Sequence, residues 1–161
     1  MTLVATHTGI SAPPDVVRAK FLAFSSLGEY KPALIRSITV LESNKTPMEL
    51  VPGDKLECVL DGATLITTIA QNNASCFSWT GSLAGGLLHG EHRFRFESIN
   101  GGLATDFYHE ETFTGYLSWV LGEGFLARKL ALRNSTLELY CKFNRDFKRW
   151  VEETSSAISA N

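Results

Sequence analysis

Hydrophobic and polar residues alternate between positions 88 and 114, which predicts two antiparallel strands that share one apolar face. On the first strand this face holds Leu88, Gly90, His92, Phe94 and Phe96, and on the second it holds Phe107, His109, Glu111 and Phe113. A turn at Asn100-Gly101-Gly102 joins the strands. Two histidines and a carboxylate therefore fall on a face that is otherwise aromatic and aliphatic. Buried polar groups need partners or a function.

The length of the turn decides which of these residues are neighbours. Paired residues must face the same side of a sheet, so only some registers are allowed. A two-residue turn pairs His92 with His109, whereas a four-residue loop pairs His92 with Glu111. Either register brings the three polar side chains within reach of one another.

The rest of the chain predicts an α+β fold with seven strands and one long helix. The strands are expected over residues 3–10, 35–42, 55–60, 64–70, 76–83, 88–98 and 104–114. Two short helices should follow the first strand, one capped by Ser11 and one over residues 26–30. The long helix is expected from about 125 to 153, and its apolar stripe contains Leu126, Leu130, Leu137, Tyr140, Phe143, Phe147 and Trp150.

These elements predict a curved sheet wrapped around the C-terminal helix, in one domain over residues 1–161. An antiparallel sheet has one apolar face to cover, and a long amphipathic helix can cover it. The space between a curved sheet and a single helix is a natural site for an apolar ligand.

Composition narrows the classes of partner. The chain has 161 residues, and its formal net charge of −2 gives no electrostatic case for nucleic acid. It has no apolar run that is long enough to span a membrane, and its first residues lack the features of a signal peptide, so we expect a cytoplasmic protein. Cys58, Cys76 and Cys141 show no CxxC spacing and are expected to be reduced. Nucleotide-binding glycine motifs and a GxSxG elbow are absent, so we expect neither a cofactor nor covalent catalysis.

Six segments, in order, carry a resemblance to a known family: ISAPPDVV, LGEYKPALIRSI, PGDKLEC, FSWTGSLAGGLLHGEHRFRFE, TDFYHEETFTGYL and FNRDFKRWVE. Together they resemble the START-like SRPBCC superfamily, in its polyketide cyclase/dehydrase and lipid-transport group. The resemblance implies a helix-grip fold with a central hydrophobic cavity. It also implies that the aromatic residues, the two histidines and Glu111 of the two alternating strands face that cavity. The family includes cyclases, dehydratases, receptors and carriers.

The inward cluster of His92, His109 and Glu111 has three interpretations. It could be a satisfied buried network that fixes strand register. It could be an acid/base site, in which Glu111 orients a histidine that moves a proton to or from a ligand. It could also present two imidazoles and one carboxylate to a metal ion, although a helix-grip fold argues against this and we expect no metal.

The leading functional hypothesis is a cofactor-independent cyclase, dehydratase or isomerase that acts on a polyketide-like substrate. In this hypothesis His92 and His109 exchange protons with the substrate and Glu111 orients one of them. The alternatives are a non-catalytic carrier or sensor of an apolar ligand, and an interaction module with a filled interior and an exposed apolar patch. The residues expected to contact the ligand are Phe77, Trp79, Leu88, Phe94, Phe96, Phe107, Phe113, Tyr140, Phe143 and Phe147.

Overall fold

A seven-stranded antiparallel sheet forms one layer of the computed structural model, which describes residues 1–60, 63–83, 86–115 and 132–159. Its strands are β1 (Thr2–Ile10), β2 (Ile35–Val40), β3 (Lys55–Leu60), β4 (Ala63–Asn72), β5 (Cys76–Leu83), β6 (Leu88–Ile99) and β7 (Ala104–Thr114). They lie in the order β1-β7-β6-β5-β4-β3-β2. Consecutive strands are therefore neighbours from β2 to β7, and β1 pairs with the far side of β7.

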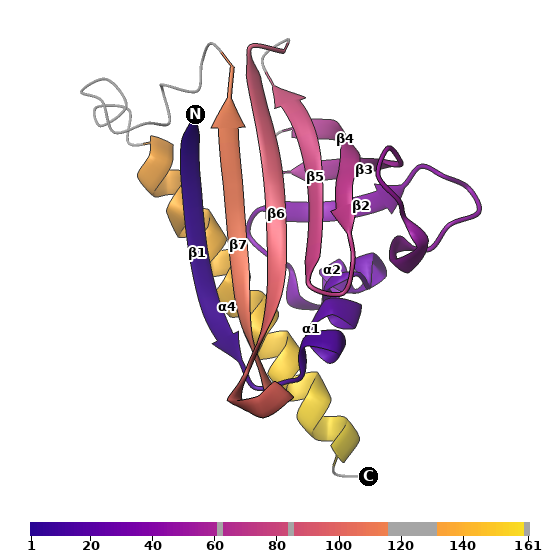
Figure 1. Ribbon diagram of the computed structural model, residues 1–161, viewed down its shortest axis with the longest axis vertical. Helices are drawn as coiled ribbons and strands as arrows, with labels where there is room; N and C mark the ends of the chain where they lie inside the picture. The colour runs from indigo at the N-terminus through magenta and orange to yellow at the C-terminus, as the bar shows by residue number, and fades with distance from the viewer. Residues whose placement is uncertain (61–62, 84–85, 116–131, 160–161) are drawn as a thin grey trace.

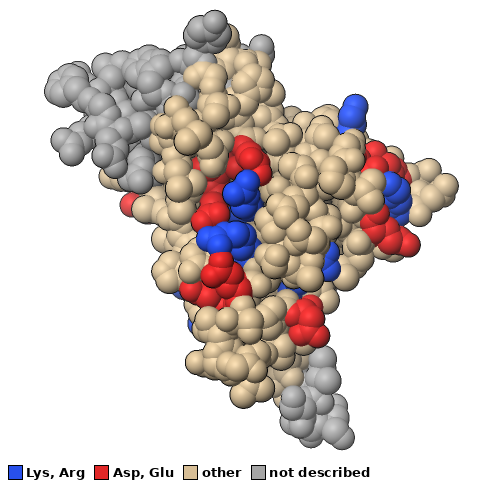
Figure 2. All heavy atoms as spheres, in the orientation of Figure 1, with Lys and Arg blue, Asp and Glu red and all other residues tan. Residues whose placement is uncertain are grey.

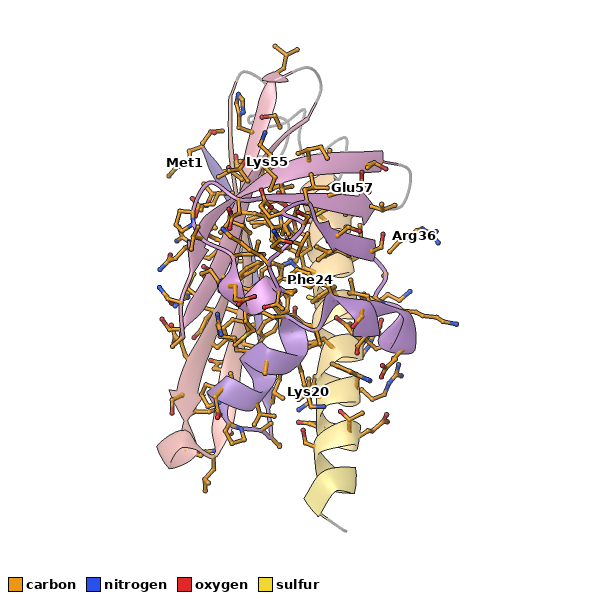
Figure 3. All side chains as sticks on the ribbon, turned by 90° about the vertical axis from the view of Figure 1, so that its right-hand side faces the viewer. Met1, Lys20, Phe24, Arg36, Lys55 and Glu57 are labelled. Atoms are coloured by element: carbon orange, nitrogen blue, oxygen red, sulfur yellow. The ribbon has the colours of Figure 1, made fainter. Side chains whose placement is uncertain are left out.

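The second layer is the C-terminal helix α4 (Leu132–Ser159), which crosses the sheet diagonally (Figure 1). Strands β2, β3 and β4 turn across the others and reach toward this helix, so the sheet curls around it (Figure 3). Two short helices, α1 (Pro14–Phe21) and α2 (Leu27–Tyr30), lie at one end of the curl, joined by the 3₁₀ turn η1 (Phe24–Ser26). Two further 3₁₀ turns are η2 (Pro47–Glu49) and η4 (Asn100–Gly102). This is the predicted helix-grip architecture, and the fold prediction is confirmed.

Aromatic side chains pack the end of the curl near α1. The ring of Phe21 lies within 6 Å of five other phenylalanine rings. These rings belong to Phe77, Phe94, Phe96, Phe107 and Phe147. All are buried, so this end of the interior is solid core.

The hairpin between β6 and β7 takes the longer of the two predicted turns. His92 pairs with Glu111, and Phe94 pairs with His109. The loop contains residues 100–103, and Asn100 and Gly101 both adopt positive φ, which Asn and Gly tolerate best. The four-residue register is therefore the observed one.

Several predicted boundaries differ from the structure. The strand predicted over residues 35–42 ends at Val40, some other strands differ by one or two residues, and two helices differ as well. Helix α1 begins at Pro14 after Pro13, and the backbone N–H of Ser11 donates to Glu152 Oε1 on α4. Ser11 therefore ties the chain to the long helix and does not cap α1. Helix α4 continues six residues beyond the predicted end at Glu153, and the predicted start of this helix lies outside the described residues.

The outer face of the sheet is charged and internally paired. Arg93 contacts Glu91 at 2.7 Å, and Arg95 contacts Glu110 at 3.0 Å across the strands. Figure 2 shows acidic and basic side chains intermixed on the face opposite α4. No helix in the described part of the chain is long and apolar enough to cross a membrane.

Candidate functional site

A cavity of about 270 Å³ lies between the sheet and the first described turns of α4, beyond the packed aromatic core. Strands β2 to β7 and the helix all contribute to its wall. Most of the lining side chains are apolar, and the lining residues are Leu34, Ile35, Cys58, Leu60, Leu65, Thr67, Trp79, Gly81, Gly90, His92, Glu111, Phe113, Thr136, Leu139 and Tyr140. The volume is close to the lower end of the ~300–1,000 Å³ range of small-molecule sites.

One wall of this cavity is polar. Glu111 on β7 and His92 on β6 face each other across the hairpin, with His92 Nδ1 4.0 Å from Glu111 Oε2. This separation is longer than a direct hydrogen bond. The hydroxyl of Tyr140 on α4 donates to the same oxygen of Glu111. Burial, followed by the charge of Glu111, raises the pKa of Tyr140, so the phenol keeps its proton.

Behind this wall lies a buried hydrogen-bonded chain. His92 Nε2 lies 2.5 Å from His109 Nε2, and His109 Nδ1 lies 3.0 Å from Asn144 Oδ1 on α4. His109 is fully buried, and its ring stacks on those of His92 and Tyr140 at centroid distances of 4.7 and 4.1 Å. These hydrogen bonds therefore link His92 in the cavity wall to α4 through His109 on β7.

Burial keeps both imidazoles neutral. Desolvation lowers the pKa of His92, and the nearby charge of Glu111 opposes this shift. Desolvation and the adjacent His92 lower the pKa of His109 well below its usual value, while the bond to Asn144 opposes the shift. Two neutral histidines can share one N–H between their Nε2 atoms, because one donates and the other accepts.

The protons of this chain can be arranged in two ways. If Asn144 Oδ1 accepts from His109 Nδ1–H, then His92 Nε2–H donates to His109, and His92 Nδ1 carries a lone pair toward the cavity. Asn144 Nδ2 is then buried without a partner. Turning the amide by 180° makes Nδ2 the donor and reverses every later bond, so that His92 Nδ1–H points toward Glu111. In both arrangements, the state of His92 is set from the helix.

Two opposed glycines make room for the polar wall. Gly81 on β5 pairs with Gly90 on β6, and both line the cavity. A Cβ at Gly90 would lie 2.5 Å from Glu111 Oε1, and a Cβ at Gly81 would lie 3.3 Å from Thr67 Cγ2. The absence of a side chain at Gly90 therefore lets Glu111 occupy its place.

The structure divides the predicted ligand-binding residues into two groups. Trp79, Phe113 and Tyr140 line the cavity. The other six described side chains lie in the packed core and do not line it: Phe77, Phe94, Phe96, Phe107, Phe143 and Phe147. The side chain of Leu88 lies outside the described part of the structure.

The predicted acid/base residues also lie at different distances from the cavity. His92 and Glu111 line the cavity, whereas His109 lies behind His92 and does not. Asn144, which is 2% exposed, is not among the site residues predicted from the sequence. Its signal was a polar residue on the apolar stripe of the helix, four positions after Tyr140 and three before Phe147.

The geometry of the histidine pair does not suit a metal ion. A metal bonded to two imidazoles at about 2.0–2.1 Å holds their nitrogens about 3 Å apart or more. The two Nε2 atoms are only 2.5 Å apart and bond each other. Among the described residues, no group of three His, Cys, Asp or Glu side chains is arranged to hold a metal.

Comparison with known proteins identifies the fold of this chain but not its family. No family model matches the chain, and no curated protein matches it significantly in sequence. Several solved structures share its fold. The hypothetical protein jhp0584 from Helicobacter pylori aligns with a TM-score of 0.70 at 12% identity, over 93% of this chain and 88% of its own. The protein TTHA0849 from Thermus thermophilus aligns with a TM-score of 0.67 at 16% identity, over 96% of this chain and 99% of its own.

A further similar structure has a named biosynthetic role. The di-domain ARO/CYC StfQ from the steffimycin biosynthetic pathway aligns with a TM-score of 0.62 at 17% identity. The match covers 96% of this chain and 52% of StfQ. At such identities these matches establish a shared helix-grip fold.

Proposed function

We propose that the protein encloses a small apolar molecule in the cavity and acts on it by proton transfer, as a cofactor-independent cyclase, dehydratase or isomerase of polyketide-like substrates. The observation that carries this proposal is one wall with two titratable groups, Glu111 and His92, in a cavity that is otherwise apolar apart from the thiol of Cys58 and the hydroxyls of Thr67 and Thr136. Such a cavity holds an apolar ligand against groups that can exchange protons with it. The similarity in fold to the ARO/CYC protein StfQ supports the substrate class.

In this proposal the polar residues have different roles. Glu111 and His92 contact the ligand and exchange protons with it, because both line the cavity. His109 and Asn144 are positioning residues, which fix the ring and the tautomer of His92 from behind. Tyr140 holds the carboxylate of Glu111 in place through its hydroxyl.

Enclosure of a ligand can be tested with the neutral fluorescent probe N-phenyl-1-naphthylamine. Leu65 lines the cavity, whereas the next residue, Ile66, is 52% exposed on the outer face of β4. Leu65→Trp should fill the cavity and weaken probe binding about 10-fold or more, and Ile66→Trp is the matched control that should leave it unchanged. A wild-type protein that fails to bind the probe would contradict the proposal.

A carrier or sensor is the second candidate, because the histidine pair is satisfied by Asn144 and could serve only to fix strand register. Native mass spectrometry of freshly purified protein can identify a co-purifying apolar molecule. That molecule, or its biosynthetic precursor, is then incubated with wild-type protein and with Glu111→Gln. An enzyme converts it, and the variant should lose about 10²-fold or more in turnover while binding persists. Binding without conversion by the wild type would identify a carrier.

A further inference from the structure

The cavity contains a negatively charged side chain and no positively charged lysine or arginine among its described lining residues. Glu111 contributes a carboxylate, and its side chain is 18% exposed, so it keeps some contact with solvent. The O–H of Tyr140 donates to it, which stabilises the anion. His92 adds no positive charge, because burial favours its neutral form.

The donors of the polar wall are directed at Glu111 itself, since a proton on His92 Nδ1 would lie on the side that faces Glu111 Oε2, 4.0 Å away. The Tyr140 hydroxyl is committed to Glu111. A carboxylate can accept about four hydrogen bonds, so one donor does not exhaust it. Because Gly90 has no side chain, Glu111 Oε1 lies within 2.5 Å of the point where any other residue would place a Cβ. A ligand that reaches this wall therefore meets an acceptor that carries negative charge.

We infer that the cavity selects apolar molecules whose polar end is a neutral or cationic hydrogen-bond donor, such as a hydroxyl or an ammonium group, and discriminates against carboxylates and other anions. The inference rests on the proposed function, because it concerns the ligand of the same cavity. An anionic end placed about 6 Å from Glu111 in surroundings of effective dielectric constant ~20 would bind about 100-fold more weakly than a neutral one. A cation gains a similar attraction, which offsets its loss of hydration.

The test uses three ligands with one skeleton: 4-phenylbutan-1-ol, 4-phenylbutylamine and 4-phenylbutyrate. Each displaces bound N-phenyl-1-naphthylamine at pH 7.5. We expect the alcohol and the amine to displace it at similar concentrations and the acid to need about 100-fold more. Direct titration with the 8-sulfonate of the same dye should show the same discrimination, because it adds one negative charge to an unchanged ring system.

Two variants locate the origin of the discrimination. Glu111→Gln removes the charge in the cavity and should bring the acid to within about 10-fold of the alcohol. Glu110→Gln removes the same charge from the next residue, which contacts Arg95 on the outer face at 3.0 Å, and should leave the discrimination intact. The inference is overturned if the acid competes as well as the alcohol in the wild type, or if both variants relax the discrimination equally. In either case probe binding itself persists, so the enclosure of an apolar ligand would stand.

Discussion

Acid should destabilise this protein through its buried histidines, and His109→Phe should remove part of that sensitivity. In the folded protein the pKa of His109 is held well below its usual value by burial and by His92. In the unfolded chain it returns to about 6.5. The unfolded state therefore binds more protons below pH 6.5, so stability is full above this pH and is lost as pH falls toward the folded pKa.

The size of the effect follows from this difference. Between pH 7.5 and 5.5, one histidine that stays neutral in the folded state costs about 1.4 kcal/mol of unfolding free energy. His92, whose pKa is also lowered by burial, adds up to a similar amount. The wild type should therefore lose about 1.4–2.7 kcal/mol over this interval, and His109→Phe should lose about 1.4 kcal/mol less.

Urea unfolding at a series of pH values measures this slope. The variant is also less stable at every pH, because His92 Nε2 and Asn144 lose their partner, at about 1–3 kcal/mol for each unpaired group. The slope separates titration from this constant loss. His89→Phe is the control, since His89 is exposed on the neighbouring strand β6 and its replacement leaves the buried histidine pair intact, so the slope should be preserved. An unchanged slope in His109→Phe would refute the account of a buried, neutral His109.

Three further predictions concern other features of the site. Gly90→Ala should displace Glu111, because the new Cβ lies 2.5 Å from Oε1, and should weaken dye binding several-fold. Gly9→Ala on β1, whose new Cβ meets nothing within 4 Å, is the control and should leave dye binding unchanged; equal titration curves for the two variants would contradict the prediction. Asn144→Leu should lower the unfolding free energy by about 1–3 kcal/mol at pH 7.5, measured by urea unfolding, because His109 Nδ1 loses its partner; full stability would show that the bond is dispensable. Burial raises the pKa of the Cys58 thiol to about 11. In native protein at pH 8, a disulfide reagent should therefore modify the exposed Cys141 first and Cys58 only after unfolding. Rapid modification of Cys58 in a Cys141→Ser variant would contradict this and would show that the cavity opens.

The sequence predicted the fold well because its signals are local. Period-two alternation assigns His92, His109 and Glu111 to the inner face whatever their neighbours are. The turn at Asn100 left two registers open, since both a two-residue and a four-residue loop preserve that parity. Only the folded hairpin distinguishes them, and it pairs His92 with Glu111.

The site was harder to predict because its depth depends on contacts between distant elements. Parity places Phe94 and Phe107 inward, but Phe21 from α1 packs against them and turns their end of the interior into core. Similarly, Asn144 reaches His109 from the C-terminal helix, 35 residues away along the chain. Neither contact follows from periodicity.

Occupation of the cavity by an apolar ligand can be followed through the indole N–H signals in a ¹H–¹⁵N NMR titration with N-phenyl-1-naphthylamine. Trp79 lines the cavity, whereas Trp150 lies on α4 with its indole N–H bonded to Glu29. Among the indole signals of the three tryptophans in the chain, Trp79→Phe and Trp150→Phe assign those of Trp79 and Trp150. With the probe in the cavity, the Trp79 signal should shift and saturate at about one probe per chain while the Trp150 signal stays in place. A bound probe that leaves Trp79 unchanged, or that shifts Trp150 instead, would show that the cavity is not the binding site.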